Sequence, residues 1–356
     1  MTRAAQRAGS WLDRLAALLV DHWYRPAPSL LACLLKPLAA CHDMLLRLRL
    51  LAYRRGWWQT QAAPVPVVVV GNLVAGGAGK TPTVIALVQA LQAAGRRPGV
   101  ISRGHGRRGS AVLQVGLQDL ATSVGDEPLL IRRRTGVPVW VARRRVDAAR
   151  ALCTAHPEVD VIVADDGLQH LALARQAQIV IFDERGAGNG LLLPAGPLRE
   201  PLPASLPDAT WVLYNATAAS TALPGALAQR RLAGALELQR WQSGAPFDAA
   251  AQRALQALSG RPVLAAAGLA APERFFVMLE AAGVEVLRQP LPDHHDFATL
   301  PWAAGTPDVL VTEKDAVKLD AARCGATRVW VVGLDFELAP GMLGALLPRL
   351  DRRPRR

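Results

Sequence analysis

The chain has 356 residues, of which 51% are hydrophobic, so it can form one large or two medium-sized domains. Its net charge of +12 favours a phosphorylated substrate, an anionic membrane surface or nucleic acid as the partner. Nucleic acid is the least favoured of the three, because aromatic residues make up only 5% of the chain and no basic stretch is interleaved with stacking aromatics.

Residues 1–63 differ in composition from the rest of the chain and are predicted to form membrane-associating helices. Apolar residues between Trp11 and Trp23 fall on one helical face, and a leucine-rich stretch covers residues 30–53. No run reaches the roughly 20 apolar residues that a bilayer-spanning helix needs. We therefore expect amphipathic helices that lie on a membrane surface. A pair of ordinary helices packed on the next domain is the alternative.

An α/β domain is predicted over residues 64–215, and it begins with a P-loop. Residues 67–70 are four valines that predict a buried parallel strand, a glycine-rich turn follows, and Lys80 and Thr81 open a helix. Glycines and a helix N-terminus aim backbone N–H groups at a polyphosphate. Lys80 would reach the β- and γ-phosphates, and the Thr81 hydroxyl would bind Mg²⁺. The predicted nucleotide-binding residues are Val74, Ala75, Gly76, Gly77, Ala78, Gly79, Lys80 and Thr81.

One position departs from the P-loop pattern. The pattern places glycine six residues before Lys80, where this chain has Val74. The surrounding glycines leave the loop its conformational freedom. A glycine-rich turn that binds nothing is the alternative, and the lysine, the threonine and both flanking elements argue against it.

Charged residues follow two further predicted elements. Arg103 lies just after a strand, at the sheet edge where parallel α/β folds bind ligands, and it either neutralises phosphate or belongs to a solvated basic loop. Asp126 and Glu127 follow Gly125 and open a helix. Capping of that helix by Asp126 explains this pair at least as well as catalysis does.

A third acidic site resembles the Walker B arrangement, in which an aspartate holds the Mg²⁺ of a P-loop site. An apolar strand over residues 159–164 ends in Asp165 and Asp166, with Gln169 and His170 close behind. We predict a metal or phosphate role for this cluster. A loop dense in glycine and proline follows at residues 188–201 and is predicted to be functional.

The remaining chain is predicted to form a second, smaller α/β domain over residues 216–335 and a C-terminal helix with a basic tail over residues 336–356. The predicted fold class is thus a P-loop NTPase-like parallel sheet domain with a second α/β domain and N-terminal amphipathic helices.

Together these segments resemble one family, the tetraacyldisaccharide 4'-kinases of lipid A biosynthesis. The matching segments occur in the family's order over roughly residues 10–335, and His105 stands where the family usually has tyrosine. They are Gly71-Asn72-Leu73 with Gly76-Gly77-Ala78-Gly79-Lys80-Thr81-Pro82, Ser102-Arg103-Gly104-His105-Gly106-Arg107, Val124-Gly125-Asp126-Glu127-Pro128, Asp165-Asp166-Gly167-Leu168-Gln169-His170, the loop from Gly188 to Pro201, Pro272-Glu273-Arg274-Phe275-Phe276, Asp293-His294-His295, and Thr312-Glu313-Lys314-Asp315-Ala316-Val317-Lys318.

The resemblance implies a function. Such enzymes move the γ-phosphate of ATP, with Mg²⁺, to the 4'-hydroxyl of a tetraacylated glucosamine disaccharide 1-phosphate, giving lipid IVA. They are peripheral proteins on the cytoplasmic face of the inner membrane, with two α/β domains joined by a hinge. The resemblance implies neither a nucleic-acid partner nor an obligate protein partner.

The resemblance also implies roles for single residues. Asp126 is the base that takes the 4'-hydroxyl proton, and His294, from the second domain, assists it, so that domain closure assembles the site. Thr81 and either Asp165 or Asp166 hold Mg²⁺. Weaker candidates for contact with substrate or nucleotide are Arg103, Glu127, Gln169, His170, Asn189, Arg199 and Glu200.

Two other functions remain open from the residues. A P-loop kinase that acts on a soluble small molecule would work without detergent and without the N-terminal helices. A nucleotide-dependent switch ATPase or GTPase would hydrolyse slowly, respond to a protein partner and form no phosphorylated lipid.

Overall fold

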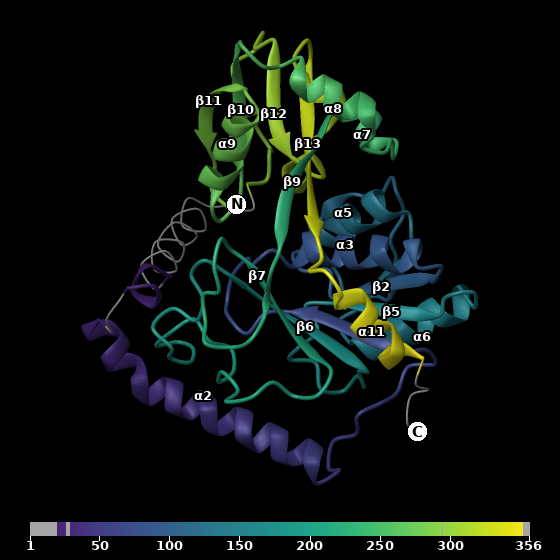
Figure 1. The fold of residues 1–356 in the computed structure, drawn as a ribbon, viewed down its shortest axis with the longest axis vertical. Coiled ribbons are helices and arrows are strands. Elements are labelled where there is room, and N and C mark those ends of the chain that lie inside the picture. The colour runs from purple at the N-terminus through teal and green to yellow at the C-terminus, as the bar shows by residue number, and fades with distance from the viewer. Residues whose placement is uncertain (1–19, 26–28, 294, 352–356) are drawn as a thin grey trace.

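The computed structural model describes residues 20–25, 29–293 and 295–351. Within these residues the strands form two sheets, one of eight strands in the order β3-β4-β2-β5-β1-β6-β7-β8 and one of five in the order β11-β10-β12-β13-β9. The two sheets lie one above the other in Figure 1. This arrangement confirms the predicted parallel sheet domain with a second α/β domain.

The first sheet is built around a parallel core. β1 pairs in parallel with β5 and β6, and every residue of β1 is buried, as its four valines predict. The carboxyl ends of these strands therefore meet at one edge, where the P-loop begins. The strands of this sheet are β1 (Val67–Gly71), β2 (Pro98–Ser102), β3 (Leu113–Gln114), β4 (Val139–Val141), β5 (Val161–Asp165), β6 (Ala177–Asp183), β7 (Thr210–Asn215) and β8 (Ala226–Leu227).

Helices cover both faces of this sheet. Alternate valines of β1 point to opposite faces, so that Val68 and Val70 join one buried cluster and Val67 and Val69 join another. The first cluster contains α3 (Lys80–Ala93) and α5 (Asp126–Thr135), and the second contains α6 (Arg145–Ala155). The short helix α4 (Ala121–Val124) precedes α5.

The second sheet is mixed. Its parallel strands are β10 (Pro262–Ala267), β11 (Glu285–Pro290), β12 (Asp308–Thr312) and β13 (Arg328–Glu337), and β9 (Gln229–Glu237) runs antiparallel to β13. Its helices are α7 (Leu238–Gln242), α8 (Ala249–Gln256), α9 (Pro272–Ala281), α10 (Glu313–Ala316) and the 3₁₀-helix η1 (Ala321–Cys324).

The two sheets share one buried core. Leu236 of β9 and Val331 of β13 belong to the same cluster as Leu129 of α5 and Val84 of α3. The long strand β9 leads from the first sheet into the second, and the antiparallel strand β13 runs back toward the first sheet, where α11 (Met342–Leu350) follows (Figure 1). The predicted domain boundaries stay predictions. The first sheet includes β8, which lies beyond the predicted boundary at residue 215.

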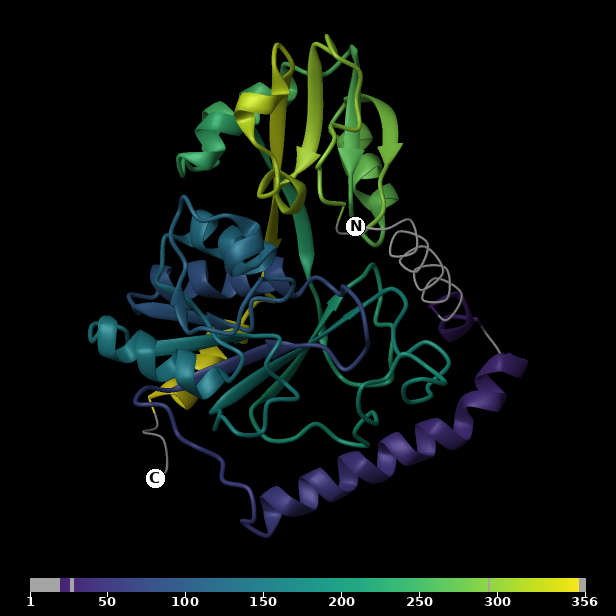
Figure 2. The same ribbon diagram turned by 180° about the vertical axis from the view of Figure 1, so that it is seen from behind.

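The N-terminal region contains a single long described helix, α2 (Leu30–Arg54), which Ser29 caps by accepting from the backbone N–H of Ala32. It runs along the side of the first sheet that faces away from the second (Figures 1 and 2). The predicted helix between Trp11 and Trp23 lies mostly outside the described residues. Within the part of the chain that the structure covers, no helix is both long and apolar enough to cross a bilayer.

Candidate active site

The P-loop joins β1 to α3, as predicted. Lys80 is the first residue of α3 and is only 9% exposed. Its ammonium donates to the Asn72 side-chain oxygen at 3.2 Å and approaches the Gly76 carbonyl at 3.5 Å. It also lies 3.8 Å from a carboxylate oxygen of Asp166. The lysine is therefore held inside the loop, where the phosphates of a nucleotide would bind.

The loop geometry explains two of its residues. Gly79 caps α3 with φ of 92°, and a Cβ there would lie 2.3 Å from the side-chain nitrogen of Asn215, so only glycine fits. Val74 is 1% exposed, packs in the apolar cluster beneath the loop and pairs with Leu198 in an isolated β-bridge. Its side chain thus points into the core, which is how the loop accommodates valine where the P-loop pattern has glycine.

Asp165 ends β5 and is buried beside the P-loop. One carboxylate oxygen accepts from the Ser102 hydroxyl at 3.0 Å, and the other is buried without a hydrogen-bond partner among the described residues. Burial, followed by the charges of Glu127 and Asp166, raises the pKa of Asp165 to about 7. A divalent cation would satisfy the unpaired oxygen and favour the ionised form, so this residue fits the predicted Mg²⁺.

Asp166 joins the P-loop to the glycine- and proline-rich loop. Its backbone has φ of 46°, an uncommon conformation for a residue other than glycine. A guanidinium nitrogen of Arg199 donates to its carboxylate at 3.1 Å. Gln169 donates to Glu200 at 2.8 Å, and its side-chain oxygen lies 3.4 Å from Arg199. The fold thus brings together four predicted residues from two separate segments.

Residue His170 lies next to this group and is half-buried. Burial, followed by the positive charge of Arg145, lowers its pKa to about 4, so the imidazole is neutral at neutral pH. Arg145 itself is 5% exposed and donates to the backbone carbonyl oxygens of Asp165 at 3.3 Å and Asp166 at 3.0 Å. It holds the turn that carries both carboxylates.

Asp126 is the first residue of α5, and the residue that caps this helix is Gly125. The expectation that Asp126 caps the helix is therefore wrong, because its own backbone is already helical. Gly125 has φ of 98°, and a Cβ there would meet the backbone of Gly104 at 3.0 Å. The Asp126 carboxylate lies 3.6 Å from the Lys318 ammonium. His294, the predicted assistant of Asp126, lies outside the described residues.

Residues of both sheets line a cavity of about 240 Å³ at the P-loop. Lys80 and Thr81 border it on one side, with Glu127 beside them, and Phe275 and Asp293 border it from the second domain. The cavity is large enough to admit part of a nucleotide, and its second-domain wall could not be located from the sequence.

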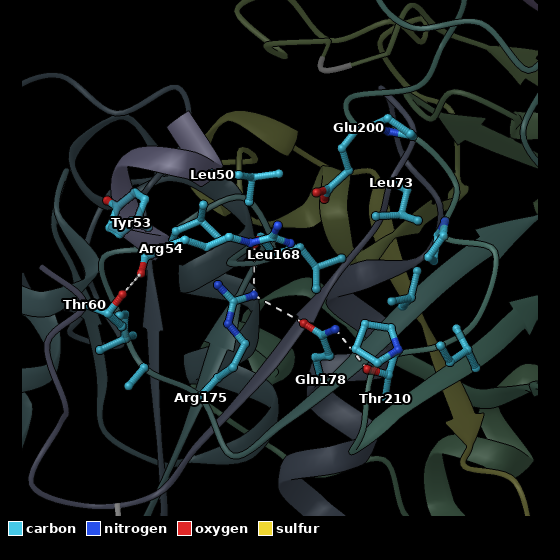
Figure 3. Close-up of a pocket in the computed structure, with 18 of the residues that line it drawn as sticks. Leu50, Tyr53, Arg54, Thr60, Leu73, Leu168, Arg175, Gln178, Glu200 and Thr210 are labelled. Atoms are coloured by element: carbon cyan, nitrogen blue, oxygen red, sulfur yellow. Dashed lines mark hydrogen bonds between the residues drawn. The ribbon is translucent and has the colours of Figure 1, made fainter. Parts of the chain in front are cut away.

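A larger cavity of about 580 Å³ lies between the C-terminal end of α2 and the first sheet (Figure 3). Leu50 and Tyr53 of α2 line it opposite Arg175 and Gln178. A guanidinium nitrogen of Arg175 donates to the side-chain oxygen of Gln178 at 3.4 Å. Its lining contains no residue from positions 74–81, so it is separate from the nucleotide site. Glu200 borders it as well.

Two weaker candidates lie apart from these cavities. Arg103 is exposed and lines neither of them. Asn189 donates to Ala195 and accepts from Leu191, so its amide folds its own loop. Both stay predictions as substrate contacts.

No role was predicted from the sequence for Asn72, Ser102, Arg145 or Lys318. Asn72 follows β1 and Ser102 ends β2, so their position at the ligand-binding edge could have identified them. Arg145 lies in a run of arginines, and Lys318 comes from another domain. Neither residue carries a local signal of its contact.

A parallel sheet whose edge carries a glycine loop, a buried lysine and a buried carboxylate defines a P-loop nucleotide-binding protein. The sequence model of one family, described as tetraacyldisaccharide-1-P 4'-kinase, matches residues 31–351. The chain belongs to this family.

Similar proteins of known name carry the same description as the family model. The tetraacyldisaccharide 4'-kinase of Leptothrix cholodnii is 54% identical over 347 residues, which cover 96% of this chain and 98% of the relative. The enzyme of the same name from Methylibium petroleiphilum is 53% identical over 93% of each chain. The crystal structure of LpxK from Aquifex aeolicus in complex with ATP superposes with a TM-score of 0.72 at 27% identity, over 91% of this chain and all of that one.

Membership of the family confirms the resemblance seen in the sequence. It also confirms the predicted function as a 4'-kinase of lipid A biosynthesis, and it favours that function over a soluble small-molecule kinase or a nucleotide-dependent switch.

Proposed function

We propose that this chain transfers the γ-phosphate of ATP to the 4'-hydroxyl of a tetraacylated glucosamine disaccharide 1-phosphate. The observation that carries the proposal is the lining of the interdomain cavity. Lys80 and Thr81 of the P-loop border it together with Glu127, the neighbour of Asp126, and with residues of the second domain. The P-loop and the first turn of α5, which carries Asp126, therefore border one space between the domains.

Each residue of the site has a part in this transfer. Lys80 and the backbone N–H groups of the loop bind the phosphates. Thr81 and Asp165 or Asp166 would hold Mg²⁺, which neutralises charge on the phosphates when bound. Asp126 accepts the proton of the 4'-hydroxyl as the new oxygen–phosphorus bond forms and the bond from the γ-phosphorus to the bridging oxygen breaks, which releases ADP. His294 assists Asp126. The second domain excludes water, which would otherwise compete as the acceptor.

The substrate carries acyl chains, and α2 is suited to a peripheral position on the cytoplasmic face of the inner membrane. Leu34, Leu38, Leu45 and Leu48 fall on one helical stripe, and each is more than half exposed. Trp57 and Trp58 are exposed just beyond the helix. Leucine and tryptophan on a basic chain are typical of a surface that enters the interface of an anionic bilayer.

We expect the double variant Leu34→Glu/Leu45→Glu to bind anionic phospholipid vesicles at least tenfold more weakly, because burial of each leucine contributes about 1.5–3 kcal/mol. Co-sedimentation with vesicles measures this. Leu120→Glu is the matched control, since Leu120 is 70% exposed and precedes α4 instead of belonging to α2. Unchanged sedimentation of the double variant would contradict membrane binding through α2.

One assay tests the whole proposal. Purified protein is incubated with ATP labelled at the γ-phosphate and the disaccharide lipid in detergent, and the products are separated by thin-layer chromatography. The proposal predicts a labelled lipid whose formation requires the disaccharide. Label found only in inorganic phosphate, with hydrolysis stimulated by a cell extract, would favour a switch ATPase and refute lipid phosphorylation.

A further inference from the structure

The second domain contacts helix α5 near both of its ends. α5 has ten residues and is therefore about 15 Å long. Its first residue, Asp126, lies 3.6 Å from the Lys318 ammonium. Arg134, in its last turn, donates to Glu313 at 2.9 Å. Both partners belong to one short segment of the second domain, residues 313–318, so this segment brackets the helix that carries Asp126.

The contact at the C-terminal end of α5 is buried and well connected. The side chains of Arg134 and Glu313 are each 7% exposed. Arg134 also pairs with Asp335 of β13 at 2.5 Å. Glu313 accepts from the Trp241 indole and from the Leu334 backbone N–H, both at 3.2 Å. These bonds hold α5 to β13 and to the start of α10.

The contact at the N-terminal end depends on how Lys318 is held. Its side chain is 8% exposed, and its ammonium donates to the His295 carbonyl at 3.0 Å and lies 3.8 Å from Asp315. Asp315 is fully buried and accepts from the Gly268 backbone N–H at 3.0 Å and from the Thr312 hydroxyl at 2.7 Å. The second domain therefore fixes the ammonium on its own side, independently of α5.

We propose that Lys318 is a positioning residue for Asp126. The Glu313–Arg134 pair fixes the other end of α5 against the same segment of the second domain. This inference rests on the proposed function, in which Asp126 is the base. The Lys318 ammonium lies 3.6 Å from the Asp126 carboxylate, so we place its effect on that carboxylate. Reacting groups must be aligned closely, and a displacement of about 1 Å can cost about 100-fold in rate.

The first test separates positioning from folding. We expect Lys318→Met to lower kcat for lipid phosphorylation by about 100-fold, normalised to ATP-binding sites, with the KM for ATP changed by less than about threefold. Lys318→Arg restores a cation and should recover kcat to within about tenfold of the wild type. Lys318→Gln keeps the polarity without the charge and should behave like the methionine variant, which guards against a packing defect.

The second test asks whether Lys318 acts through Asp126. If it does, Lys318→Met should add less than about threefold to the loss caused by Asp126→Asn, because the group that it positions is already disabled. Arg261→Met is the control for charge loss in the second domain, since Arg261 pairs with Asp308 at the start of β12, and residues 313–318 follow the other end of that strand. It should keep kcat within about twofold.

Three results would overturn the inference: a normal kcat for Lys318→Met, a loss fully additive with Asp126→Asn, or an equal loss of ATP-binding sites and turnover. The last would show that Lys318 only stabilises the fold. The wild type in the same assay separates this failure from that of the proposed function. Labelled lipid from the wild type with an unaffected Lys318→Met variant refutes positioning alone, whereas no labelled lipid from the wild type refutes the kinase itself.

Discussion

Asp126→Asn should lower kcat for lipid phosphorylation by about 10²- to 10⁴-fold, the usual contribution of a general base. The amide has nearly the shape of the carboxylate but does not accept the proton of the 4'-hydroxyl. The affinity for ATP should change by less than about twofold, because Asp126 lies at the start of α5 and not in the loop that binds phosphate. Steady-state kinetics with labelled ATP and direct ATP titration measure the two quantities.

A matched control keeps this result specific. Asp147 also lies in the first turn of a helix, α6, where a carboxylate interacts favourably with the helix dipole. Asp147→Asn removes that interaction without touching the site and should leave turnover nearly unchanged. Normal turnover by Asp126→Asn would exclude Asp126 as the base, whatever its neighbours do.

Arg134→Met should lower the free energy of unfolding by about 3–5 kcal/mol, the second large effect that we expect. Removing one partner of a buried ion pair leaves the other charge buried and uncompensated. Burial already raises the pKa of Glu313, and Arg134 opposes that rise. The folded variant therefore holds a proton on Glu313 more tightly than the unfolded chain does. Its stability deficit should shrink as the pH falls toward the pKa of Glu313.

Urea denaturation of the wild type and the variant at neutral and mildly acidic pH measures both effects. Arg261→Met is again the comparison, because Arg261 is 44% exposed and Asp308 keeps its bonds to Arg328 and Trp330. Because the Arg261 side chain is partly exposed and buried Asp308 keeps two other donors, we expect its loss to cost about 0–1 kcal/mol. A loss for Arg134→Met no larger than that of the control would show that Glu313 does not depend on this partner.

The site was predictable where its signal is local. The four valines of β1, the glycine loop and Lys80 adjoin one another in the chain, and a strand that ends in Asp165 needs only a short window to be recognised. Strand period, turn chemistry and helix capping act over a few residues. The interpretation of Asp126 as a helix cap was wrong, because residue type alone does not say whether Gly125 or Asp126 is the last residue before the helix.

The order of strands and loops along the chain was thus enough to predict a P-loop domain and candidate residues at its phosphate-binding edge. The side chain of Val74 pointing into the core, the second-domain wall of the cavity and the contact of Lys318 with Asp126 depended on the folded molecule. The physical reason is distance along the chain. Asp126 and Lys318 are separated by nearly 200 residues, so only the packing of both sheets on one core brings the ammonium to the carboxylate.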